Sequence, residues 1–134
     1  MISMYEIKKE LDEIGIIYPQ NSSSFMQFYC ETKQKRTVKF FIDLENDYLE
    51  LSAYTSGIPL TRNNLLLMNK LNTMVNSPLK ILKFGILGDG QRIRIELDMP
   101  LRHVVDATII TLFMHLVLNV VDQILDNADV YSNE

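Results

Sequence analysis

The chain has 134 residues, of which 47% are hydrophobic and 22% are charged, and its formal net charge is −4. This length and composition are typical of one globular domain that folds without a disulfide or a metal, so we expect a single domain over residues 1–134. The acidic balance argues against a nucleic-acid-binding protein, which usually has a basic face. The only cysteine, Cys30, excludes an intrachain disulfide and favours a cytoplasmic protein.

The first expected element is an amphipathic helix. Ser3 and Glu6 have the spacing of a capping box at its start, and Gly15 is a plausible end. Apolar residues recur between them at helical spacing, at Met4, Ile7, Leu11 and Ile14. No basic region followed by an apolar run precedes this helix, so we predict no signal peptide.

Three strands joined by short turns come next, over residues 25–32, 36–43 and 49–54. Such strands are expected to form an antiparallel meander. Aromatic side chains alternate with its inward positions or end its third strand, at Phe25, Tyr29, Phe41 and Tyr54. If these side chains are exposed, they form a patch for a partner; if a helix covers them, they are ordinary core. The sequence leaves both alternatives open.

A second helix and a hairpin follow the meander. The helix is expected over 64–75, after the cap candidate Thr61, and Pro78 cannot continue it. Strands over 80–87 and 91–99 flank a Gly-Asp-Gly turn at 88–90, which is typical of a β-hairpin. With the last helix, the expected order is α-β-β-β-α-β-β-α. The fold class is therefore α+β, an antiparallel sheet with helices packed on it.

The last helix, expected over 106–126, has apolar residues on two sides. One stripe consists of Ile109, Phe113, Leu116, Val120 and Ile124. The other consists of Ile110, Met114, Leu118, Val121 and Leu125. A surface helix needs only one apolar stripe, so the second needs a cover of its own. Polar interruptions make a membrane span a poor explanation, and we expect residues 126–134 to form a frayed tail.

We assign the first of these stripes to the chain's own sheet and the second to the partner subunit of a homodimer. A two-fold contact uses the same patch on both chains, so neighbouring residues of one stripe can pair with each other. A small-ligand-binding domain is the alternative, with an apolar pocket between the last helix and the sheet. A deeper core of the chain itself is a third possible cover for the second stripe.

No set of residues predicts catalysis or metal binding. His103 and His115 have no cysteine or carboxylate at metal-ligand spacing. Cys30 lies on an expected strand, where a buried, unreactive thiol is the usual finding. We therefore expect a non-enzymatic protein without cofactor or metal, which acts through an unidentified protein partner.

The stretch from Asn76 to Pro100 resembles the central hairpin of the YbjN-type bacterial proteins. In that family a helix ending in Asn leads into a strand with an aromatic-Gly pair, then an acidic-Gly turn and an alternating strand that ends near Pro. The corresponding residues here are Asn76, Phe84-Gly85, Asp89-Gly90 and Pro100. Members are described as regulators of sensory transduction, and their fold is similar to that of type III secretion chaperones. The resemblance implies a small α+β protein, commonly a homodimer, that binds proteins without catalysis, and it brings no catalytic residues.

Overall fold

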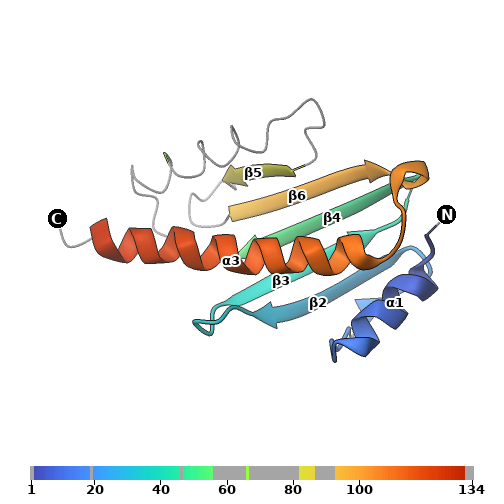
Figure 1. Cartoon of the computed structure of the whole chain (residues 1–134), viewed down its shortest axis with the longest axis horizontal. Coiled ribbons are helices and arrows are strands. Elements are labelled where there is room, and N and C mark those ends of the chain that lie inside the picture. The colour runs from blue at the N-terminus through green and yellow to red at the C-terminus, as the bar shows by residue number, and fades with distance from the viewer. Residues whose placement is uncertain are drawn as a thin grey trace.

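In a computed structural model, the residues described are 2–18, 20–45, 47–55, 66, 82–86 and 93–131. The elements in chain order are α1 (Met4–Glu13), β1 (Gln20–Asn21), β2 (Phe25–Glu31), β3 (Thr37–Asp43), β4 (Tyr48–Thr55), β5 (Leu82–Ile86), β6 (Ile93–Pro100), the 3-10 turn η1 (Leu101–His103) and α3 (Thr108–Tyr131). The strands form one antiparallel sheet in the order β1-β2-β3-β4-β6-β5, and α1 and α3 lie on the same face of it (Figure 1). The α+β class is confirmed.

Helix α1 begins and ends where local chemistry predicts. The backbone N–H of Glu6 donates to Ser3 Oγ at 3.3 Å, which satisfies one of the open donors of the first turn. Gly15 has a φ of 79°, a left-handed conformation that suits a residue without a Cβ just after a helix. The buried face of the helix consists of Met4, Ile7 and Leu11.

The meander of β2, β3 and β4 is confirmed, with Phe28 opposite Phe40 and Phe40 opposite Ala53. The two turns contain Lys35 and Asp47, whose φ values of 67° and 62° let the chain reverse within a few residues. Strand β1 was not predicted. It has two residues, Gln20 and Asn21, and pairs with β2 at the edge of the sheet.

The hairpin of β5 and β6 is also confirmed as an antiparallel pair. On its other side β6 pairs with β4, so that Leu97 lies opposite Leu51 and Arg94 opposite Tyr54. The expected Gly-Asp-Gly turn lies outside the described residues. The helix expected over 64–75 also lies outside them, except for Leu66, which is helical and exposed.

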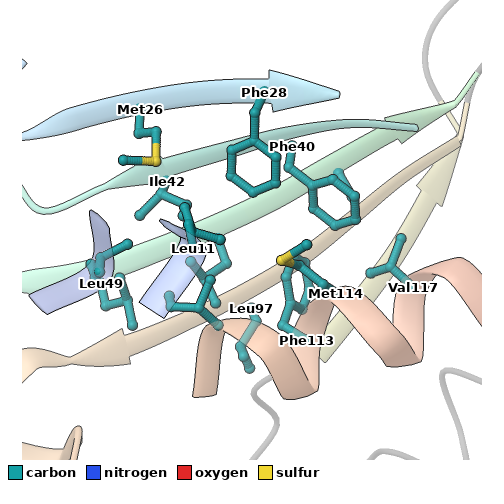
Figure 2. Close-up of a cluster of buried hydrophobic side chains, with 14 of the residues drawn as sticks. Leu11, Met26, Phe28, Phe40, Ile42, Leu49, Leu97, Phe113, Met114 and Val117 are labelled. Atoms are coloured by element: carbon teal, nitrogen blue, oxygen red, sulfur yellow. The ribbon is translucent and has the colours of Figure 1, made fainter. Parts of the chain in front are cut away.

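The core of the described residues lies between the sheet and helices α1 and α3. Phe28 and Phe40 stack on the inner face of the sheet with ring centroids 5.4 Å apart, and Phe113 of α3 meets Phe40 edge to face at 6.1 Å. Figure 2 shows Leu11 of α1 and Phe113, Met114 and Val117 of α3 within the same cluster as the strand residues. Burial of this apolar surface is the main force that holds α3 on the sheet.

The burial of α3 corrects the assignment of its two stripes. Ile110, Met114 and Val121 were assigned to a partner subunit, but they are 1%, 5% and 0% exposed in the chain's own core. A partner cannot reach them, so the assignment of these three residues to an interface is wrong. Leu118 is half-buried and packs against the core, and the side chain of Leu125 lies outside the described residues.

The other stripe, assigned to the chain's own sheet, is divided. Phe113 and Val120 are buried, Ile109 is half-buried and Leu116 is 41% exposed; the side chain of Ile124 lies outside the described residues. The physical reason is the rotation of the helix. The two stripes are adjacent on its surface, and the sheet covers the boundary between them, so that each stripe contributes buried residues.

Helix α3 starts at Thr108, where the backbone N–H donates to Asp106 Oδ1 at 2.9 Å. It continues to Tyr131, so the tail expected over 126–134 is helical as far as that residue. In the part of the chain that the structure describes, no helix combines the length and the apolar character that a membrane span requires.

Candidate protein-binding surface

The four aromatic residues singled out in the sequence lie on the face of the sheet opposite α1 and α3. Successive side chains of a strand point to opposite faces, and the neighbours of these residues, Met26, Phe28, Phe40 and Ala53, are buried under the helices. Tyr29 is 54% exposed, and Phe25, Phe41 and Tyr54 are half-buried. Neither helix covers them, which leaves an aromatic surface on this outer face.

Three of the four rings form a contact row across β2, β3 and β4. The centroids of Phe25 and Phe41 are 6.0 Å apart, and Phe41 meets Tyr54 edge to face at 5.3 Å. Tyr29 is linked to this row through Lys39, whose Nζ lies 5.7 Å from the centroid of Tyr29 and 5.0 Å from that of Phe41. Such contacts fix the orientation of the rings without burying them.

Charged side chains accompany the rings in rows that run across the strands. The strand register places Asp43 opposite Glu50 and Glu50 opposite Asp98, and we call these three residues the acidic row. Four residues away from the acidic row along each strand, Lys39 lies opposite Tyr54 and Tyr54 opposite Arg94. The guanidinium carbon of Arg94 lies 5.5 Å from the centroid of Tyr54, and Arg94 also forms an ion pair with Glu96. The outer face therefore has an acidic end and a basic end.

The pKa of Glu50 reports the repulsion between the carboxylates of the acidic row. Partial desolvation raises the pKa of this carboxyl, and the charges of Asp98 and Asp43 raise it further. Like charges opposite each other on neighbouring strands are destabilising. The acidic row therefore favours a positively charged group at this end of the face.

The rings and charges line a shallow hollow of about 330 Å³ on the outer face. Its lining includes Phe25, Phe41, Tyr54, Asp43, Glu50 and Asp98, together with Arg94 and Glu96. Across the described residues, no group of three or more histidine, cysteine or carboxylate side chains is arranged to hold a metal ion. The hollow suits side chains from a partner better than it suits a small ion.

A second apolar surface lies on the side of α3 that faces away from the sheet. Leu112 is 64% exposed and Leu116 41%, one helical turn apart, and Val105 before the helix is also exposed. A small hollow of about 180 Å³ lies beside the start of the helix and is lined in part by Met99, Ile109 and Leu112. We call Val105, Leu112 and Leu116 the outer stripe.

The residues considered for chemistry form no catalytic arrangement among the described residues, although His103 lines the small hollow beside the start of α3. Cys30 is half-buried on β2, and burial raises the pKa of its thiol to about 11, which keeps it protonated and unreactive at neutral pH. His115 is exposed on α3. His103 is exposed in η1 and accepts a long contact of 3.4 Å from Arg102 Nε at its Nε2.

The acidic row is the part of the outer face that the sequence analysis missed. The strand alternation was a usable signal, since Asp43 and Glu50 fall on the same face as Phe41 and Tyr54. The position of Asp98 beside them depends on the pairing of β6 with β4, which no local pattern reveals.

Comparison with known proteins gives no match to any family model or curated protein sequence. Among solved structures, the chain is similar to YbjN, a candidate transcription regulator from E. coli, with 12% identity over 96% of this chain and 93% of that one and a TM-score of 0.52. It is also similar to a chain of the ExsC–ExsE complex, with 13% identity over 90% of this chain and 86% of that one and a TM-score of 0.53. The structural resemblance expected from the sequence is thereby confirmed at the level of the fold.

Proposed function

We propose that this chain is a non-enzymatic protein-binding module, chaperone-like or regulatory, which acts as a homodimer in the cytoplasm. The observation that supports this function is the outer face of the sheet, where Phe25, Phe41 and Tyr54 form a contact row that neither α1 nor α3 covers. Aromatic side chains are enriched in surfaces that bind proteins, and an exposed apolar patch with polar residues at its rim is typical of such surfaces. The likeness to ExsC, whose structure is of a complex with ExsE, supports a protein as the ligand.

The packing of α3 disfavours the alternative, a small-ligand pocket between the last helix and the sheet. That space is occupied by Phe113, Met114 and Val117, which are buried against the strands. Phe113 contacts the ring of Phe40 directly. A ligand there would have to displace well-packed side chains, at a cost of several kcal/mol for each large side chain removed from the core.

The proposed dimer uses the outer stripe in place of the stripe first assigned to it. Leu112 and Leu116 lie one helical turn apart on a surface that the chain's own sheet leaves open. Two copies of such a stripe, related by a two-fold axis, can cover each other. This contact is independent of the outer face of the sheet, so partner binding and dimerisation can be tested separately.

Site-specific photo-crosslinking in the native host tests the protein-binding function. A benzophenone amino acid replaces Tyr54 in the hollow in one strain and Tyr5, which is exposed on α1, in the other. We expect a discrete adduct with another protein from position 54 and none from position 5. The Phe41→Ser substitution, which removes the central ring of the row, should abolish the adduct from position 54 while the circular dichroism spectrum stays unchanged.

Two results contradict the proposed function. One is the absence of an adduct at position 54 in cells that make the protein at its native level. The other is a set of adducts shared by positions 54 and 5, which would indicate random encounter.

A further inference from the structure

We propose that the outer face binds an extended segment of a protein partner whose basic side chain lies over the acidic row, beside Phe25, and whose apolar side chain, two residues away, lies over Phe41. This inference rests on the proposed protein-binding function and specifies the chemistry of the partner.

The spacing of the hollow fits an extended segment that runs along the strands. Alternate residues of a strand point to the same face and lie about 6.6 Å apart. The hollow contains the acidic row at one end, Phe41 and Ser52 two residues further along, and Tyr54 beyond them. A partner segment with the same spacing places residue i over the carboxylates, level with Phe25, and residue i+2 over Phe41.

The two ends of the face differ in the charges that surround them. At the basic end, Lys39 already contacts two rings, and Arg94 contacts Tyr54 and Glu96. At the acidic end, the charges of described residues that raise the pKa of Glu50 belong to other carboxylates, those of Asp98, Asp43, Glu45 and Glu96. The face is complementary to a positive charge at the acidic end.

A long basic side chain matches both parts of the lining. Its aliphatic stem can lie against Phe25, Phe41 or Tyr54, as the stems of lysine and arginine do on apolar surfaces, while its charged group reaches the acidic row. A bare metal ion would require ligands that converge, and the described residues contain no such group. A phosphate backbone would be repelled by the same carboxylates, so a basic protein segment is the favoured occupant.

Fluorescence anisotropy with the full chain tests this specificity. The probe is a labelled synthetic peptide of three Lys-Ser-Leu-Ser repeats; a second peptide has glutamate in place of each lysine, and a third has serine in place of each leucine. We expect the first peptide to bind and the other two to bind at least several-fold more weakly. Glu50→Gln should weaken binding of the first peptide about two- to fivefold, the range of an exposed ion pair.

A matched control separates position from net charge. Glu13→Gln removes the same charge from α1, away from the outer face, and should leave the affinity unchanged. A second readout is the carboxyl pKa of Glu50, followed by nuclear magnetic resonance. The lysine peptide should lower this pKa, because a nearby positive charge stabilises the carboxylate.

The inference is overturned if the lysine and glutamate peptides bind equally, or if Glu50→Gln and Glu13→Gln have the same effect. Its failure can be told apart from failure of the proposed function. If position 54 is crosslinked to a partner and this capture is lost in Phe41→Ser, while the lysine and glutamate peptides bind equally, the protein-binding function stands and the charge assignment fails. If position 54 gives no adduct and no peptide binds, both fail.

Discussion

At the residue scale, one ion pair ties the hairpin between β2 and β3 to the last helix. Arg36 Nη1 lies 3.0 Å from Asp122 Oδ1, and the backbone N–H of Gln34 donates to Oδ2 at 3.4 Å. Burial by itself raises the pKa of Asp122, but hydrogen bonds from Thr32, Arg36 and Gln34 outweigh it and hold that pKa below its usual value. The folded state therefore prefers the ionised carboxylate.

Replacing this carboxylate gives a stability prediction with a defined pH dependence. Asp122→Asn should lower the free energy of unfolding at neutral pH by about 1.5–3 kcal/mol, the range for hydrogen bonds to charged groups. The folded pKa is below the unfolded value of about 3.9, so this stabilisation is present above that value and is lost as the pH falls through the folded pKa. Urea denaturation at several pH values should show the difference shrinking below about pH 4.

Glu13→Gln is the control for that experiment, since Glu13 is exposed at the end of α1. It should change the free energy of unfolding by less than about 0.5 kcal/mol. A deficit for Asp122→Asn that stayed constant from neutral to acid pH would mean that side-chain shape, and not ionisation, accounts for the effect.

At the element scale, the amphipathic pattern predicted that α3 exists but not which side of it faces the sheet. Ile110 is in the core, and Leu112, two positions later, is 64% exposed. Both are large aliphatic residues on the same helix, and composition cannot tell them apart. Periodicity identifies a helix with two apolar sides, whereas its rotation depends on which side chains fit against Phe40 and its neighbours.

Truncating these two residues tests that rotation. Ile110→Ala removes a buried side chain and should lower the free energy of unfolding by about 2–5 kcal/mol. Leu112→Ala, an equivalent truncation on the exposed side, should change it by less than about 0.5 kcal/mol. Denaturant unfolding is measured at a protein concentration low enough that association does not contribute. Equal losses for the two variants would contradict the orientation of α3.

The strands show a similar division between local and long-range information. Alternation and turn residues predicted the meander and the final hairpin, because both depend on neighbours in the sequence. The same alternation placed Phe25, Phe41 and Tyr54 on one side of the sheet. The alternation could not predict that α1 and α3 pack on the opposite face. The pairing of β6 with β4 and the short edge strand β1 are tertiary contacts without a local signature.

At the scale of the whole molecule, the outer stripe bears on assembly. Leu112→Glu places a charge in the middle of the proposed contact between subunits, where burying it without a partner is costly. We expect the wild-type chain to be a dimer and this variant to be a folded monomer in analytical ultracentrifugation. Tyr5→Glu adds the same charge at an exposed position of α1 and should leave the dimer intact.

A wild-type chain that sediments as a monomer at high micromolar concentration would contradict the proposed dimer. A Leu112→Glu variant that remains dimeric would show that the two subunits contact each other through another surface. Circular dichroism of both variants shows whether the fold is retained, which separates loss of association from unfolding.

The contact of α3 with the meander has a consequence for the unfinished chain during its synthesis. A ribosome releases β2, β3 and β4 well before α3, so Phe28, Phe40 and Ile42 remain without the cover that Phe113 and its neighbours later provide. The hydrogen bond from Thr111 Oγ1 to Glu10 Oε1, 3.4 Å long, likewise joins helices about a hundred residues apart in the sequence. Nascent chains that stop before α3 therefore expose apolar side chains on the inner face of the sheet in addition to the aromatic rings of the outer face, and we expect them to aggregate or to recruit chaperones until the last helix emerges.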